Sequence, residues 1–284
     1  MTISRLRDVV ENCYNNGQYT IAGFRKIPAV ASAPGIWSDI TMAPGSPKPN
    51  YYTGTELAAT VFDPRSTLYH GEAVSPFGKY LHKISLSALA SVVQAGTYML
   101  CDFLMYYPLI DMDSTDEQTF TNPISLPRYA SGDGVRAFLV ATNPYVGSGS
   151  FVINYTDFNG NSGVTSNLHL CNTSTNIGTI VNSTTTALNT VGPFIQGPGN
   201  KQGIRSVQSI QFYAPNGGLG ALALCKPLAT FTINEIAATT EIDFLSLHPS
   251  LPKIEDGAVL GLLCCPGGSI AACWYTGVLT TIFN

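Results

Sequence analysis

Runs of apolar residues along the chain indicate β-strands over most of its length. The longest run, residues 98–107, is rich in aromatic side chains and stops at Pro108, as a central strand would. Shorter runs occupy residues 137–142, 150–156, 207–213, 221–225 and 228–234. The dipeptides Asn159-Gly160 and Asn216-Gly217 lie between runs, and such pairs tolerate the positive φ of hairpin turns. The pattern predicts a mainly β fold, an antiparallel β-sandwich of which a jelly roll is one form, with a hairpin formed by 150–156 and 164–170.

Helical spacing of apolar residues is confined to short segments. Residues 3–15 have this spacing and are followed by Asn16-Gly17, which predicts a short N-terminal helix. The uncharged stretch 84–101 contains several serines and is too polar to cross a membrane. We interpret it as a buried helix over residues 85–95 followed by a strand. A third short helix is expected near residues 235–247.

A proline-rich segment separates the first helix from the strands. Residues 27–52 contain five prolines among small residues, a composition that sustains neither a helix nor a central strand. It predicts an extended arm, which lies either on the rest of the fold or on a neighbouring molecule. We therefore expect an N-terminal helix and arm over residues 1–52 and a β-sandwich body over residues 53–284.

A polar sub-lobe is expected near residues 143–200. Asp157 is the only charged side chain between Ala137 and Asn200 when His169 is counted as neutral, and residues 165–190 are dominated by Ser, Thr and Asn. Two interpretations remain open for this tract. Its hydroxyls and amides either satisfy backbone groups within a structured lobe, or they belong to a long loop that a partner orders.

Charge and cysteine usage narrow the class of protein. Charged residues make up 11% of the chain, against about 25% in an average soluble protein, and the formal net charge is -4. Nucleic acid and membrane are therefore not expected as partners. The N-terminal residues Arg5, Arg7, Asp8 and Glu11 stand where a signal peptide needs apolar residues. Seven cysteines without a C-x-x-C pair predict reduced, buried thiols, with no disulfide framework and no zinc site.

One acidic loop is the only candidate for a metal site. Asp111, Asp113, Asp116 and Glu117 gather within seven residues, but they lack the register of a Ca²⁺ loop. We interpret the loop as a solvated connection with Asx-type turns, and Asp111, Asp113 and Asp116 remain weak candidates for a structural cation. The four histidines are isolated, and the glycine-rich stretches 147–150 and 197–203 fit no nucleophile elbow or phosphate loop. We expect no catalytic residue and no cofactor, so the protein is not expected to be an enzyme.

Several short segments together resemble a known class of protein. They are residues 102–111, 126–129, 132–142, 203–209 and 249–257. In combination they resemble virion structural proteins of tailed bacteriophages, over roughly residues 80–275. The resemblance carries no catalytic motif.

The resemblance implies a role in assembly. Within such a family, the composition suits a capsid decoration (cement) protein that binds and stabilises the shell of the major capsid protein, on the capsid surface of the virion after synthesis in the host cytoplasm. Self-association, as a homotrimer matching the threefold positions of the capsid lattice, and shell contacts from the arm are expected. The alternatives are a neck or tail component, a carbohydrate-binding β-module favoured by the frequent aromatics, and a hydrolase favoured only by the acidic loop.

Overall fold

The computed structural model describes residues 3, 5–28, 33–89, 96–147, 149–172, 176–183, 192–199, 203–234, 238–247, 251–268 and 273–284. Helical turns are α1 (Leu6–Asp8), η1 (Val9–Cys13), η2 (Tyr14–Asn16), η3 (Ile40–Met42), η4 (Pro64–Ser66) and α2 (Phe244–Leu247). The strands before residue 142 are β1 (Tyr19–Lys26), β2 (Ser38–Asp39), β3 (Gly45–Ser46), β4 (Thr60–Val61), β5 (Lys79–Leu89), β6 (Gly96–Asp111), β7 (Gln118–Thr119) and β8 (Arg136–Ala141). Those that follow are β9 (Ser150–Asp157), β10 (Val164–Thr165), β11 (His169–Leu170), β12 (Ile204–Phe212), β13 (Leu219–Ile233), β14 (Thr240–Asp243), β15 (Lys253–Ile254), β16 (Leu260–Pro266) and β17 (Trp274–Phe283).

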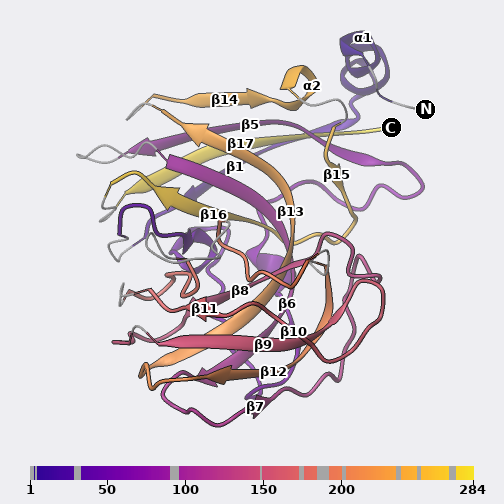
Figure 1. Ribbon diagram of the computed structural model, residues 1–284. Coiled ribbons are helices and arrows are strands. Elements are labelled where there is room, and N and C mark those ends of the chain that lie inside the picture. The colour runs from indigo at the N-terminus through magenta and orange to yellow at the C-terminus, as the bar shows by residue number, and fades with distance from the viewer. Residues whose placement is uncertain are drawn as a thin grey trace.

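Three antiparallel sheets make up the fold, which confirms the mainly β, sandwich-like architecture (Figure 1). The central sheet has the order β2-β16-β6-β13-β8, with β4 also paired to β6. The sheet at the top of Figure 1, here the upper sheet, has the order β14-β5-β17-β1-β3, with β15 also on β5. The lower sheet has the order β10-β9-β12-β7, with β11 also on β9. A jelly roll has two sheets, so the third sheet distinguishes this fold from it.

The upper and lower sheets cover two halves of the same face of the central sheet. At one end of β6, Tyr98 and Leu100 pack into a core shared with the upper sheet. Further along the same strand, Leu104 and Tyr107 pack into a second core with the lower sheet. The long strands β6 and β13 thus run through both halves, and Asp102 lies on β6 where one core gives way to the other.

The proline-rich arm lies on the fold itself, the first of the two placements that its composition allowed. Its side chains Trp37, Met42 and Tyr52 pack on the opposite face of the central sheet, in a third core with Phe103 and with Phe62, which follows the arm. The rings of Phe62 and Phe103 meet edge-on with centroids 5.1 Å apart. Trp37, Met42 and Tyr52 are thus buried within the chain, while Tyr51 of the same arm is 57% exposed. Contacts from the arm to a shell stay a prediction.

The expected boundary at residue 52 divides the upper sheet, because a strand that precedes it pairs with a strand that follows it. Strand β1 lies inside the upper sheet, with β17 on one side and β3 on the other, and all eight of its residues pair with β17. The sequence pattern concealed this strand because Ala22 and Gly23 dilute its apolar content. Since β1 is an interior strand, residues 1–52 cannot be removed without opening the upper sheet.

Of the three expected helices, the N-terminal one is confirmed as the helical run from Leu6 to Asn16. The helix expected over 85–95 is wrong where the chain is described, because 85–89 belong to β5 and residues 90–95 lie outside the described residues. In β5, Leu86 and Ala88 are fully buried while Ser85 and Ser87 face outward, which is a period of two. Near 235–247, β14 precedes the single turn α2, and residues 235–237 lie outside the described residues.

Most of the predicted strands are confirmed. Two of them form one continuous strand, and one of the two predicted hairpin turns connects strands of different sheets. The runs 221–225 and 228–234 form the single strand β13, which passes Pro227 by means of a β-bulge. Strand β9 pairs antiparallel with β10 and β11, as the predicted hairpin requires. Gly217 has a φ of 66°, as its turn signal predicts. That turn joins β12 of the lower sheet to β13 of the central sheet, so it forms a corner between sheets instead of a hairpin.

The polar tract satisfies backbone groups within the fold, the first of its two interpretations. The Asn172 side chain is buried and donates to the carbonyl oxygens of Ile180 and Ser183 at 2.7 and 2.8 Å. Asn182 donates to the carbonyl oxygen of Pro193 and accepts from the amide of Leu139 in β8. The described part of 143–200 is therefore hydrogen-bonded to the central sheet through Asn182, and its strands β9, β10 and β11 belong to the lower sheet. Residues 148, 173–175, 184–191 and 200 lie outside the described residues.

All seven cysteines are free thiols, and all but Cys265 are buried. Burial raises the pKa of the Cys171 thiol to about 12, which keeps it protonated and unreactive at neutral pH.

Within the described residues, the helical segments are too short to span a bilayer.

Lys26 fastens the arm to the upper sheet. Its ammonium is buried and donates to the carbonyl oxygens of Pro47, Ala43, Thr41 and Lys48 at 2.7, 3.1, 3.4 and 3.4 Å. Burial lowers the pKa of Lys26 to about 8, so the charged form still dominates at pH 7.

We expect Lys26→Met to lower the free energy of unfolding by about 2–3 kcal/mol, because it leaves buried carbonyl oxygens without a donor. Urea denaturation at pH 7 measures the change. The matched control is Lys48→Met, whose ammonium forms a partly exposed ion pair with Asp63 and should contribute less than about 1 kcal/mol. Equal effects of the two substitutions would contradict the role of Lys26.

Candidate functional site

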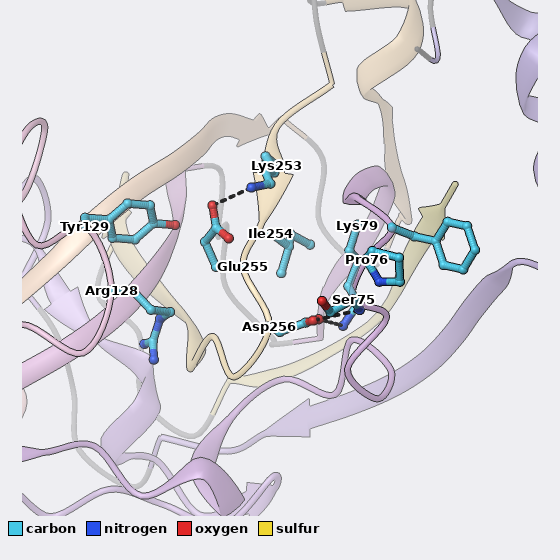
Figure 2. A pocket seen from close by; sticks show the side chains of 10 residues that line it. Ser75, Pro76, Lys79, Arg128, Tyr129, Lys253, Ile254, Glu255 and Asp256 are labelled. Atoms are coloured by element: carbon cyan, nitrogen blue, oxygen red, sulfur yellow. Dashed lines mark hydrogen bonds and ion pairs between the residues drawn. The ribbon is translucent and has the colours of Figure 1, made fainter. Parts of the chain in front are cut away.

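A polar cleft of about 410 Å³ opens at the junction of the two halves of the fold (Figure 2). Three segments form its walls: residues 75–79 at the start of β5, residues 128–129 in the connection between β7 and β8, and residues 253–256 at and after β15. In Figure 2, Arg128 and Tyr129 lie on one side, Ser75 and Pro76 lie on the other, and Glu255 lies between them.

Arg128 is fixed in the cleft wall by a buried carboxylate. Its Nε and Nη2 donate to the two oxygens of Asp102 at 2.8 and 2.7 Å, and Nη2 also donates to the carbonyl oxygen of Phe103. Asp102 is fully buried, and its Oδ1 accepts a further hydrogen bond from the amide of Val259 at 2.9 Å. This bidentate pair ties the 128–129 loop to the middle of β6, where the two cores meet.

Lys79 and Asp256 form a second pair on the opposite wall. The Lys79 ammonium is buried, lies 3.4 Å from Asp256 Oδ1 and donates to the carbonyl oxygen of Glu72 at 2.7 Å. Asp256 also accepts from the amides of Val74 and Ser75. Burial acts to raise the pKa of Asp256, but these amides and the Lys79 ammonium outweigh it and hold the pKa below its ordinary value. The carboxylate is therefore ionised at neutral pH.

The remaining polar groups of the cleft are more exposed. Lys253 Nζ lies 2.8 Å from Glu255 Oε1, in an ion pair at the mouth. Tyr129 has a φ of 53°, an uncommon conformation for a bulky residue. Burial raises the pKa of its hydroxyl, and the nearby Asp102 carboxylate raises it further, so the hydroxyl stays protonated. The cleft thus presents balanced charges and neutral hydrogen-bonding groups.

A second candidate surface is the outer face of the upper sheet. Where β1, β17 and β5 run side by side, the outward positions include Ile21, Val278, Trp274 and Leu89, with exposed fractions of 60%, 37%, 45% and 42%. We call this set the upper-sheet face. Ser and Thr side chains lie between these residues, and the Arg25 guanidinium stacks 3.9 Å from the Trp274 ring centroid.

Charges on this sheet gather towards one edge. On β14, Glu241 and Asp243 pair with Lys83 of β5 at 3.0 and 3.7 Å. On the other side of β5, strands β17 and β1 contribute Arg25 as the charged residue of the upper-sheet face. The result is a mostly uncharged surface of branched and aromatic side chains bordered by ion pairs.

The acidic loop forms the turns that its pattern predicts. The amide of Asp113 donates to Asp111 Oδ1 at 2.9 Å, which is an Asx-type turn, and the amide of Asp116 donates to Ser114. Asp113 Oδ1 also accepts from the amide of Gly217. In the part of the chain that the structure describes, no three His, Cys, Asp or Glu side chains are grouped to hold a metal ion. The loop residues Asp111, Asp113 and Asp116 do not line the cleft.

No cleft residue was singled out from the sequence, although one signal was present. Asp102 is a charged residue inside the apolar run 98–107, and a carboxylate in a central strand requires a buried partner. Three of the segments that carry the resemblance, 102–111, 126–129 and 249–257, meet at this cleft through Asp102, Arg128 and Glu255.

Comparisons of the chain with models of protein families, with curated proteins and with solved structures found no match.

Proposed function

We propose that this chain is a structural protein of a tailed-phage virion, and that it acts as a capsid decoration protein that binds the shell of the major capsid protein. The resemblance of the segments named above points to virion proteins. The observation that carries the assembly role is the upper-sheet face, where Ile21, Val278, Trp274 and Leu89 stay exposed on adjacent strands. Large apolar and aromatic side chains exposed together on one face of a sheet are typical of interaction sites.

The chemistry of this face suits a lasting contact. Interface centres are poor in charged residues and rich in aromatic ones, and Trp and Arg are frequent hot spots. Here Trp274 and Arg25 are already held against each other, which reduces the conformational entropy lost on binding. The main attachment surface in this proposal is the upper-sheet face, because Trp37, Met42 and Tyr52 of the proline-rich arm are buried within the chain.

Self-association as a homotrimer remains part of the proposal. A threefold oligomer would match the threefold positions of a capsid lattice and place three copies of the face on the shell. The low fraction of charged residues favours close packing of many copies, because repulsion and desolvation costs are small.

The test has two stages. Quantitative mass spectrometry of purified virions should find the chain at a fixed ratio to the major capsid protein. The variant Val278→Lys, which places a charge in the middle of the face, should then bind particles lacking the protein at least tenfold more weakly than the unmodified chain.

Tyr213→Lys is the matched control, because Tyr213 is also a large exposed side chain, 55% exposed against 37% for Val278, and lies next to β12 of the lower sheet. It should bind particles as the unmodified chain does. Absence of the chain from virions would overturn the function, and normal binding by Val278→Lys would overturn the assignment of the face.

A further inference from the structure

We propose that the cleft at the junction of the two halves binds an uncharged saccharide. Its volume of about 410 Å³ lies within the roughly 300–1,000 Å³ of small-molecule sites. This inference concerns Arg128, Tyr129 and Glu255 and does not rest on the virion role.

Charge balance in the cleft selects a neutral ligand. Each cation already has an acidic partner: Arg128 pairs with Asp102, Lys79 with Asp256 and Lys253 with Glu255. The net electrostatic field in the cleft that could attract an anion or a cation is therefore small. A ligand hydroxyl donates and accepts at once, so it can hydrogen-bond to either member of an ion pair without disturbing the balance.

Two polar atoms of the cleft have no hydrogen-bond partner among the described residues and can bind such a ligand. Arg128 uses Nε and Nη2 on Asp102 and Phe103, and its Nη1 has no partner among the described residues. Glu255 Oε1 accepts from Lys253, and Oε2 has no partner in the same part of the chain. The donor and the acceptor both belong to residues that line the cleft, so they can bond to hydroxyls of one sugar, and hydrogen bonds to charged groups are the stronger ones.

The cleft also offers apolar surface and a rigid frame. Pro76, Phe77 and Tyr129 contribute apolar groups that can cover the C–H face of a sugar ring. Three hydrogen bonds hold the Arg128 guanidinium, and the Lys226 ammonium lies 5.4 Å from the Tyr129 ring centroid. Groups held in place before binding lose little entropy when a ligand arrives.

The experiment titrates the full chain with a panel of neutral oligosaccharides built from hexoses, N-acetylhexosamines, deoxyhexoses and pentoses, followed by ligand-observed NMR up to 10 mM. At least one member should bind. Glu255→Gln, which replaces a charge-assisted acceptor by a neutral one, should then raise its Kd about tenfold.

Glu241→Gln is the matched control, because Glu241 is also exposed and also pairs with a lysine, Lys83, but lies on the β14 edge. Its Kd should stay within twofold of that of the unmodified chain. The proposal is overturned if no neutral member of the panel binds, if the two variants behave alike, or if sialylated or sulfated oligosaccharides bind more tightly than the neutral ones.

Discussion

Arg128→Leu is expected to lower the free energy of unfolding by about 3–5 kcal/mol, because it leaves a carboxylate buried without a countercharge. Asp102 is fully buried, and Arg128 occupies both of its oxygens. The amide of Val259 and the neighbouring Tyr129 hydroxyl would remain as donors, and neither supplies a positive charge. Urea denaturation at pH 7 measures the loss.

Two further variants separate the buried pair from a general effect of removing arginine. Arg65→Leu removes an arginine whose side chain is 80% exposed, and an exposed pair of this kind contributes little to stability because water and salt screen it. The double variant Arg128→Leu with Asp102→Asn removes both charges and keeps an acceptor for Val259. It should regain a large part of the lost stability. If Arg128→Leu costs no more than Arg65→Leu, the pair does not secure the junction.

Acidification from pH 7.5 to 5.5 is expected to destabilise the protein, through three buried histidines. His70, His82 and His169 are at most 5% exposed, and burial lowers the pKa of each below its ordinary value of 6.5. The unfolded chain then binds more protons than the folded one as the pH falls below 6.5, so stability is highest above that pH and declines below it. Since each histidine adds at most one proton on unfolding, the limiting slope has an upper bound of about 4 kcal/mol per pH unit.

The hydrogen bonds of two of these rings explain why protonation is unfavourable. The amide of Gln196 donates to His169 Nε2 at 2.9 Å, so that nitrogen has no room for a proton. His70 Nε2 lies 2.9 Å from the carbonyl oxygen of Ala258, which makes Nε2 the donor and leaves Nδ1 facing the Lys79 ammonium at 3.3 Å. Each ring therefore accepts a bond that its charged form would lose.

Urea denaturation at pH 7.5, 6.5 and 5.5 tests this dependence. His169→Gln should reduce the limiting slope by about 1.4 kcal/mol per pH unit, since it removes one titrating group. A stability that does not change between pH 7.5 and 5.5 would contradict the prediction.

The junction links the Asp102–Arg128 pair and His70, one of the three buried histidines, to the cleft. Asp102 and Arg128 hold the connection between β7 and β8 to β6, while Lys79 and His70 lie on the opposite side and contact each other. Weakening either side should disturb the cleft as well as the fold. The saccharide proposal is therefore tested at Glu255, at the mouth, where the structure does not depend on the side chain.

A strand could be predicted from the sequence wherever the burial of its side chains alone determines the pattern of apolar residues. The run 98–107 is apolar on both faces because β6 is covered on both, and it was recognised for that reason. Strand β5 was mistaken for a helix because Ser85, Ser87 and small residues interrupt its apolar side chains. Strand β1 was overlooked because Gly23 and Ala22 weaken its pattern. Both strands have one exposed face, so their partners decide their conformation.

The sequence by itself determined the mainly antiparallel β class, the N-terminal helical run, the hairpin from β9, the turns at Gly160 and Gly217 and the low charge of the surface. These follow from local conformational preference and from the burial of each side chain. Only the tertiary structure decided that β1 enters the upper sheet, that the arm covers the central sheet, and that Asp102, Arg128 and Glu255 meet at one cleft. These residues are far apart along the chain, and no local preference reports which distant segment satisfies a buried charge or covers an apolar face.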